Sequence, residues 1–264
     1  MQFTKTIKRL HALGGDNWEI YKLARQMVAD GQDVIELAIG EPDVPPPDYL
    51  VDATVEALKA GRTGYSPGAG EDTLRNALAM RYSKSSGRAI DAEQILCFPG
   101  TQTALYAVMR AIAGEADEVL VGDPMYATYG PVIAAAGART VPIPLKAENG
   151  FRLSAADVEA RLTPATKVLF LNSPHNPTGA VLSAKDVAEL GALAKRHDLW
   201  ILADEVYEEL VFVDVAFHSP LSRPELSERV IVVCSISKSH AAPGFRSGWC
   251  VGPAEFCAQL LPLS

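Results

Sequence analysis

From residue 95 onward, short runs of apolar or β-branched residues alternate with Ala- and Leu-rich stretches that have helical spacing. Such alternation is typical of parallel strands joined by crossover helices. Seven strands are predicted, over residues 95–98, 118–122, 139–143, 167–171, 200–203, 230–234 and 247–251. We therefore expect an α/β fold in which helices sandwich a mostly parallel seven-stranded sheet.

The helices of this pattern are predicted over residues 101–113, 126–136, 154–162 and 183–197. Two of them begin with the spacing of a capping box, Ser154 with Asp157 and Ser183 with Asp186. Ahead of the sheet, helical patterns cover residues 18–30, 48–60 and 71–85. Because a Pro triplet at 45–47 separates the first of these from the rest, residues 1–47 are interpreted as an N-terminal arm and small-domain segment, and residues 48–264 as the large α/β domain.

Charge and cysteine content exclude several classes of protein. The 264 residues carry 24 Lys and Arg against 32 Asp and Glu, a net charge of −8 without a basic stripe, so neither a nucleic acid nor an anionic membrane is expected as a partner. No apolar run is long enough to span a bilayer, and the first residues lack the apolar core of a signal peptide, so a cytoplasmic location is expected. The four cysteines, Cys97, Cys234, Cys250 and Cys257, have no metal-ligand spacing, which predicts reduced buried thiols and no metal.

Ligands of parallel sheets bind at the carboxyl ends of the strands, so the residues after each strand are the first candidates for a site. Gly100, Thr101 and Gln102 follow the first strand and open a helix, whose free N–H groups could hold a phosphate. An ordinary Thr-capped helix explains the same residues. Asp204 and Tyr207 follow the fifth strand, where a carboxylate could hold a protonated ring nitrogen or simply cap a helix.

Lys238 gives the most informative segment. It follows the sixth strand, bounded by Ser235, Ser237 and Ser239, with Arg246 eight positions further on. A lysine whose amine is kept partly neutral can form a Schiff base, and arginine can bind a phosphate through two N–H groups. Taken alone, a lysine such as Lys238 is more often just a surface lysine. Taken with the other segments, it suits an aldehyde that carries a phosphate.

In chain order, GEPD from Gly40, YSPGAG from Tyr65, GTQ, DPMY, NSPHNPTG from Asn172, DEVY and SISK with Arg246 resemble the successive motifs of the class I/II aminotransferases. These are the pyridoxal-phosphate enzymes of the aspartate aminotransferase fold type. The resemblance covers nearly the whole chain. It implies an enzyme that moves an amino group between an amino acid and a 2-oxo acid by a ping-pong Schiff-base mechanism, with pyridoxal 5'-phosphate as cofactor.

The resemblance also implies a role for each matching residue. Lys238 resembles the lysine that binds the cofactor covalently and carries a proton, and Asp204 the carboxylate paired with the ring nitrogen. Asn176 and Tyr207 match the donors to the ring's 3-oxygen, and Tyr126 matches the aromatic residue stacked on the ring. The phosphate site is implied for Gly100, Thr101, Gln102, Ser235, Ser237 and Arg246. Tyr65 resembles the tyrosine that reaches the phosphate of a neighbouring subunit, which implies a homodimer, and Gly40 corresponds to a backbone contact with the substrate carboxylate.

The small C-terminal domain of the family, which supplies an arginine for the substrate's α-carboxylate, has no counterpart in these 264 residues. A truncated, non-catalytic cofactor-binding remnant is therefore one alternative function. A lyase or synthase of the same family is another, because it uses the same cofactor chemistry. A transcriptional regulator is not expected, since residues 1–47 are too short and too weakly basic for a DNA-binding module.

Overall fold

A computed structural model of the chain describes residues 2–14, 19–37 and 39–263. Its sheet contains the seven strands that the sequence predicts, with each boundary within one residue of expectation. The strands are β1 (Ile95–Phe98), β2 (Glu118–Asp123), β3 (Arg139–Pro144), β4 (Thr166–Asn172), β5 (Trp200–Asp204), β6 (Val230–Ser235) and β7 (Gly248–Val251). The strand order is β1-β7-β6-β5-β4-β2-β3, and β7 alone is reversed, so that its pairings with β1 and β6 are antiparallel and the others parallel.

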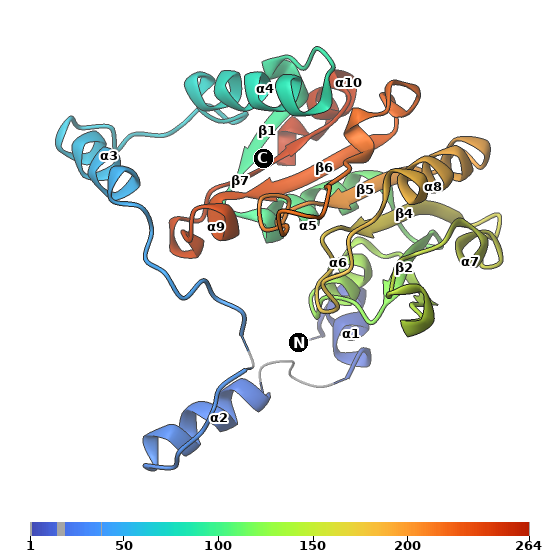
Figure 1. Cartoon of the computed structure of the whole chain (residues 1–264), viewed down its shortest axis with the longest axis horizontal. Coiled ribbons are helices and arrows are strands. Elements are labelled where there is room, and N and C mark those ends of the chain that lie inside the picture. The colour runs from blue at the N-terminus through green and yellow to red at the C-terminus, as the bar shows by residue number, and fades with distance from the viewer. Residues whose placement is uncertain (1, 15–18, 38, 264) are drawn as a thin grey trace.

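Two apolar cores lie on opposite faces of this sheet, because successive side chains of a strand point to opposite sides. On β5, Ile201 and Ala203 belong to one core and Leu202 to the other. The first core is covered by α4 (Asp72–Ser86), α7 (Ala155–Glu159) and α8 (Ala184–Arg196). The second is covered by α5 (Thr101–Ile112), α6 (Tyr129–Ala136) and α10 (Ala254–Leu260). The predicted helix–sheet–helix sandwich is thus confirmed (Figure 1).

The remaining helices are α1 (Lys5–Ala12), α2 (Glu19–Ala29), α3 (Asp48–Lys59) and α9 (Ile236–Ser239). The helix α1, which the sequence pattern did not reveal, packs on α6, and Arg9 there donates to the carbonyl of Ala134 over 3.2 Å. In Figure 1, α2 and α3 stand apart from the sheet on extended segments, and neither helix has a buried residue. Trp18, where the helix over 18–30 was expected to begin, lies outside the described residues.

Two predicted helices differ from the expectation in length. The helix predicted from residue 126 begins at Tyr129, because residues 124–128 form the turn that follows β2. The helix predicted over 154–162 ends at Glu159, ahead of Pro164, which cannot continue a helix. Both expected serine caps are formed, as Ser154 and Ser183 each accept from the backbone N–H three residues on. None of the described helices has the length and apolar character that a bilayer span requires.

Candidate active site

The antiparallel strand β7 decides which residues meet at the carboxyl edge of the sheet. Because β7 runs against its neighbours, it starts where β1 and β6 end, and Gly248 pairs with both Phe98 and Ser235. The segment before β7, which contains Arg246, therefore reaches the same edge as the residues after β1 and β6. This edge collects most of the residues that the sequence singles out.

Gly100, Thr101 and Arg246 form a close-packed cluster at the start of α5. Gly100 has a φ of +92°, and a Cβ atom there would lie 2.1 Å from Nη2 of Arg246. Arg246 is itself held by Nη1 donating to the Pro243 carbonyl (2.6 Å) and Nη2 to the Pro99 carbonyl (3.4 Å). Because only glycine tolerates this φ and this approach, Gly100 lets the guanidinium lie against the first turn of α5.

The hydroxyl of Thr101 is the feature of this cluster that most indicates a ligand. Its Oγ1 is buried and has no hydrogen-bond partner within the described chain, and no side chain caps the helix. The helix α5 is formed, but Thr101 does not cap it, as the alternative from the sequence would require. Buried hydroxyls in folded proteins are almost always hydrogen-bonded, so an acceptor that completes this site is expected. Together with Arg246 and the α5 dipole, Thr101 suits a phosphate group.

The other predicted members of the phosphate cluster have partners within the chain. Ser235 is fully buried, and its Oγ accepts from the backbone N–H of Ser237 over 3.3 Å. Gln102 is exposed, and its Oε1 accepts from the Thr128 hydroxyl over 2.9 Å. Ser235 and Ser237 lie at the end of β6. In the sheet, β7 separates β6 from β1, the strand that Gly100 follows.

Asp204 is a buried carboxylate at the end of β5, 4% exposed. Its Oδ2 accepts from the hydroxyl of Tyr129 at 2.8 Å, and its Oδ1 from the backbone N–H of Val206 at 3.2 Å. Burial raises the pKa of Asp204 to about 6, and these two hydrogen bonds act in the opposite direction. The contact with Val206 is local, but no helix follows it, so Asp204 is not the cap of a helix. A cation beside Asp204 would stabilise its charged form.

Two tyrosines, Tyr129 and Tyr126, lie near Asp204. Tyr129 is fully buried and packs against Phe170 with ring centroids 4.3 Å apart. Tyr126 lies edge-on to Tyr129, with centroids 5.6 Å apart, and is 39% exposed. Burial, and after it the charge of Asp204, raises the pKa of Tyr126. Sequence reasoning missed Tyr129, for which the only signal is its position one helical turn after Tyr126.

Asn176 and Tyr207 come from the ends of neighbouring strands and meet directly. The side-chain amide of Asn176 donates to the Tyr207 hydroxyl over 3.2 Å. A second asparagine supports the pair, because the Asn172 side chain accepts from the Asn176 backbone (2.8 Å) and donates to the Asp204 carbonyl (3.1 Å). Burial raises the pKa of Tyr207, while the bond from Asn176 opposes this rise. The pair offers hydrogen-bond donors beside Asp204.

Lys238 lies in α9, at the end of β6. Its Nζ donates to the Gly40 carbonyl over 2.6 Å, which brings the arm to the sheet edge. Burial lowers the pKa of Lys238, and the carboxylate of Glu41 opposes this effect. Partial burial therefore favours the neutral amine that a nucleophilic lysine needs.

Tyr65 is the predicted site residue that the structure leaves apart from the rest. It lies in the loop between α3 and α4, fully exposed, and no hydrogen bond of the described residues joins it to the edge. Its expected partner, a neighbouring subunit, is not part of a single chain.

The four cysteines are free, three of them buried and Cys97 half-buried. Among the described residues, no three His, Cys, Asp or Glu side chains gather as a metal site requires.

Replacing Gly100 tests the close approach of Arg246. We expect Gly100→Ala to lower the free energy of unfolding by more than about 2 kcal/mol, because the positive φ and the displaced guanidinium both cost energy. In an Arg246→Ala background the guanidinium is absent, so Gly100→Ala made there measures the backbone cost alone. Urea unfolding curves compare the two. Equal losses would contradict the packing of Arg246 on Gly100.

Comparisons with known proteins agree with this arrangement. Residues 32–264 match the family model described as aminotransferase class I and II. The chain is 44% identical over 260 residues to an arginine–pyruvate transaminase of Pseudomonas aeruginosa, covering 98% of this chain and 66% of that protein. It is 40% identical over 234 residues to an aspartate aminotransferase of Streptomyces avermitilis, covering 88% and 57%. A solved Thermus thermophilus aspartate aminotransferase with maleate superposes with a TM-score of 0.93 at 31% identity, over 100% of this chain and 68% of that one.

The chain thus has the α/β fold of the aspartate aminotransferases. The chain belongs to the class I and II aminotransferase family. It spans between 57% and 66% of the length of these two curated relatives.

Proposed function

We propose that the protein is a pyridoxal-phosphate-dependent aminotransferase that moves an amino group from an amino acid to a 2-oxo acid. The observation that carries the proposal is the meeting of three groups at one sheet edge: a lysine with a lowered pKa, a buried carboxylate, and an arginine beside an unpartnered hydroxyl at a helix start. Membership of the family supports the same reaction.

The residues fit the cofactor group by group. Arg246, Thr101 and the start of α5 would bind the phosphate, and Ser235 and Ser237 would add donors to it. Asp204 would hold the ring nitrogen in its protonated form, since a buried carboxylate gains most from a neighbouring cation. Pyridoxal phosphate supplies an aldehyde that condenses with amines and a ring that accepts electrons.

The chain's own residues then have definite tasks. Lys238 would provide the neutral amine that attacks the aldehyde and, once released by the substrate, would carry the proton removed from the substrate Cα. Asn176 and Tyr207 would donate hydrogen bonds to the ring oxygen next to the aldehyde. Tyr126, the most exposed of the rings near Asp204, would cover one face of the cofactor ring, and Gly40 would contact the substrate carboxylate through its backbone.

An absorbance spectrum of the 264-residue chain with pyridoxal phosphate tests this function. We expect a visible band that bleaches when an amino acid is added, together with formation of the matching 2-oxo acid. The panel includes arginine and aspartate, with pyruvate as acceptor, because the names of the relatives point to these compounds. A stable band that no amino acid bleaches identifies a cofactor-binding remnant. Release of free ammonia together with the cleaved side chain identifies a lyase, because a transaminase leaves the amino group on the cofactor. Absence of any band contradicts the proposal.

The hydroxyl of Thr101 gives a prediction with two opposite signs. Without cofactor, Thr101→Val removes a buried, unpartnered hydroxyl, so we expect it to raise the free energy of unfolding by about 1 kcal/mol. With cofactor, the lost hydrogen bond to a charged phosphate should weaken binding about tenfold. The control is Thr103→Val, because the Thr103 hydroxyl already donates to the carbonyl of Pro99, just ahead of α5. Urea unfolding and cofactor titration measure the two effects, and unchanged affinity would remove Thr101 from the phosphate site.

A homodimer is part of the same proposal. The arm and α3 expose apolar side chains that a single chain leaves uncovered, namely Ile20, Leu23, Ile35, Leu37, Tyr49 and Leu58. Large exposed apolar patches are typical of surfaces between subunits. Sedimentation should give twice the monomer mass, and Leu23→Glu together with Leu37→Glu should shift it to the monomer.

The free cysteines support a reducing compartment, the cytoplasm, as the location.

A further inference from the structure

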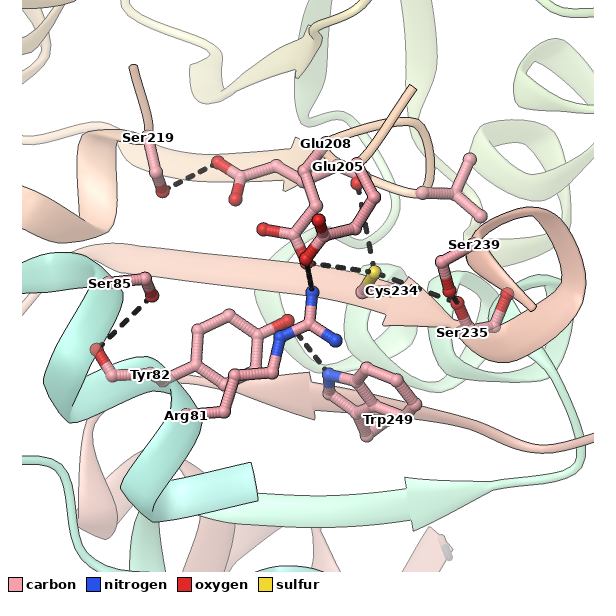
Figure 2. A network of polar contacts seen from close by, with 12 residues as sticks. Arg81, Tyr82, Ser85, Glu205, Glu208, Ser219, Cys234, Ser235, Ser239 and Trp249 are labelled. Atoms are coloured by element: carbon pink, nitrogen blue, oxygen red, sulfur yellow. Dashed lines mark hydrogen bonds and ion pairs between the residues drawn. The ribbon is translucent and has the colours of Figure 1, made fainter. Parts of the chain in front are cut away.

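A polar network lies behind the sheet edge, on the face covered by α4, and joins residues that are remote in sequence (Figure 2). Arg81 of α4 donates through Nη2 to Oε1 of Glu208 at 2.5 Å and to Oε1 of Glu209 at 2.8 Å. Glu208 and Glu209 directly follow Tyr207 in the chain. The guanidinium therefore holds the segment that carries the phenol paired with Asn176.

The surroundings of Glu208 make this contact a specific one. The Glu208 side chain is 10% exposed and that of Arg81 29%, so the pair is largely withdrawn from water. Burial raises the pKa of Glu208, and the Arg81 charge opposes this rise. A carboxylate in such a place needs its cation, since an unpaired buried charge is costly. Arg81 thus ties the backbone after Tyr207 to a rigid helix.

The same network reaches the end of β6. The thiol of Cys234 donates to Oε1 of Glu208 over 3.5 Å and to the backbone carbonyl of Glu205 over 3.7 Å. Cys234 precedes Ser235 of the phosphate cluster. Figure 2 shows Cys234 between the glutamates on one side and Ser235 on the other. The ends of β5 and β6 are therefore connected through the carboxylate that Arg81 binds.

Glu205 closes the network from the other side. Its Oε1 accepts from the Ser219 hydroxyl at 2.7 Å, while its Oε2 is buried without a partner in the described chain. Burial first, and then the charge of Glu208, raises the pKa of Glu205 well above its usual range. Among the described residues, Arg81 pairs with Glu208 and Glu209, and Glu205 joins the network through Cys234 and Ser219.

We propose that Arg81 is a positioning residue for Tyr207: it fixes the turn after β5, so that the phenol stays in hydrogen-bond reach of Asn176 and of the cofactor's ring oxygen. The contact to the cofactor rests on the proposed function, whereas the fixing of the turn does not. Arg81 and Glu208 are 127 positions apart, so the tether also links α4 to the site.

Hydrogen exchange on the cofactor-free chain tests the tether itself. In Arg81→Met we expect the amides of Glu208 and Leu210, which donate to the carbonyls of Glu205 and Tyr207, to exchange at least about tenfold faster. Arg229→Met is the matched control, because Arg229 is also partly buried (19% exposed) and pairs with Asp198 ahead of β6, away from the site. Unchanged exchange of residues 205–210 in Arg81→Met overturns the proposal, whatever the chain does with pyridoxal phosphate.

A double-mutant cycle on the loaded protein tests the effect on Tyr207. The readout is the pH midpoint of the bound cofactor's visible band, which loss of a donor to the ring oxygen should shift. Arg81→Met should shift it in the same direction as Tyr207→Phe, with no further shift in the double variant. Arg81→Lys should bring the pH midpoint part of the way back to that of the unmodified protein. Arg81→Met combined with Glu208→Gln should restore resistance to urea but leave the midpoint shifted. The proposal is overturned if the shifts of Arg81→Met and Tyr207→Phe add in the double variant, or if the midpoint recovers together with stability when Glu208→Gln is added. Either result would mean that the ion pair of Arg81 with Glu208 is merely structural.

Discussion

Lys238→Ala should abolish the covalent bond to pyridoxal phosphate that borohydride traps in the unmodified chain. Lys238 is the lysine at the candidate site, where its Nζ contacts the Gly40 carbonyl and its pKa is lowered by burial. Without this amine no Schiff base to the protein can form there, so the loss is expected to be complete. Mass spectrometry after reduction measures the adduct and locates it on the chain.

The control for this loss is Lys146→Ala. Lys146 is an exposed lysine that pairs with Asp157, and its removal should leave the adduct unchanged. Non-covalent binding of the cofactor through Arg246 and Thr101 should survive in Lys238→Ala, detectable as a shifted free-aldehyde band. A reducible adduct that persists at full yield in Lys238→Ala would place the reactive amine elsewhere.

Asp204→Asn should weaken cofactor binding by about 30-fold or more, because removing one member of a buried charge pair costs about 2–5 kcal/mol. Asparagine keeps one acceptor oxygen for the Val206 amide, and its NH2 group can donate to the Tyr129 hydroxyl, so the local structure should persist. It lacks the negative charge that stabilises a protonated ring nitrogen. Titration monitored by absorbance measures the affinity, with the exposed Asp198→Asn as the control. Equal affinities would remove Asp204 from the site.

The same substitution should alter the stability of the cofactor-free protein in the opposite direction. The pKa of Asp204 rises from 3.8 to about 6 on folding, so the native state holds its proton more tightly than the unfolded chain does. The stability that this proton contributes is therefore full below about pH 4 and falls as the pH rises through 6, by at most about 3 kcal/mol. Asp204→Asn should flatten this part of the profile. Urea unfolding between about pH 4 and 7 measures it, and parallel profiles for the two proteins would contradict the raised pKa.

Most strands were predictable because they are apolar runs buried on both faces, as in β4, where Val168 to Leu171 are all buried. The edge strand β3 instead alternates exposed and buried residues, which is also a strand pattern. Capping serines likewise fixed the starts of α7 and α8. The short helices α1 and α10 escaped prediction, because eight and seven residues give too few turns to establish a period. The late start of α6 depends on the turn at Pro124, which local periodicity does not register.

The location of the candidate site residues at the sheet edge could also be predicted, because ligands bind at the carboxyl ends of parallel strands. The contacts around each candidate residue could not be predicted. The bond from Tyr129 to Asp204 and the ion pair of Arg81 with Glu208 join residues 75 and 127 positions apart. Neither pair has a spacing motif, so only the folded chain reveals them. Sequence reasoning therefore named the chemical groups and missed those that hold them in place.

The antiparallel strand β7 also has a consequence for the order in which the molecule can assemble. β1 lies at the edge of the sheet and pairs with β7 alone. Ile95 therefore has no strand partner until Val251 is in place. A ribosome delivers β1 first and β7 last, and pairing across so long an intervening chain is slow. The helix start beside Gly100 and the lysine after β6 can therefore become neighbours only once β7 has been synthesised and has paired with both strands. A nascent chain released before Gly248 would hold both halves of the site without the strand that joins them.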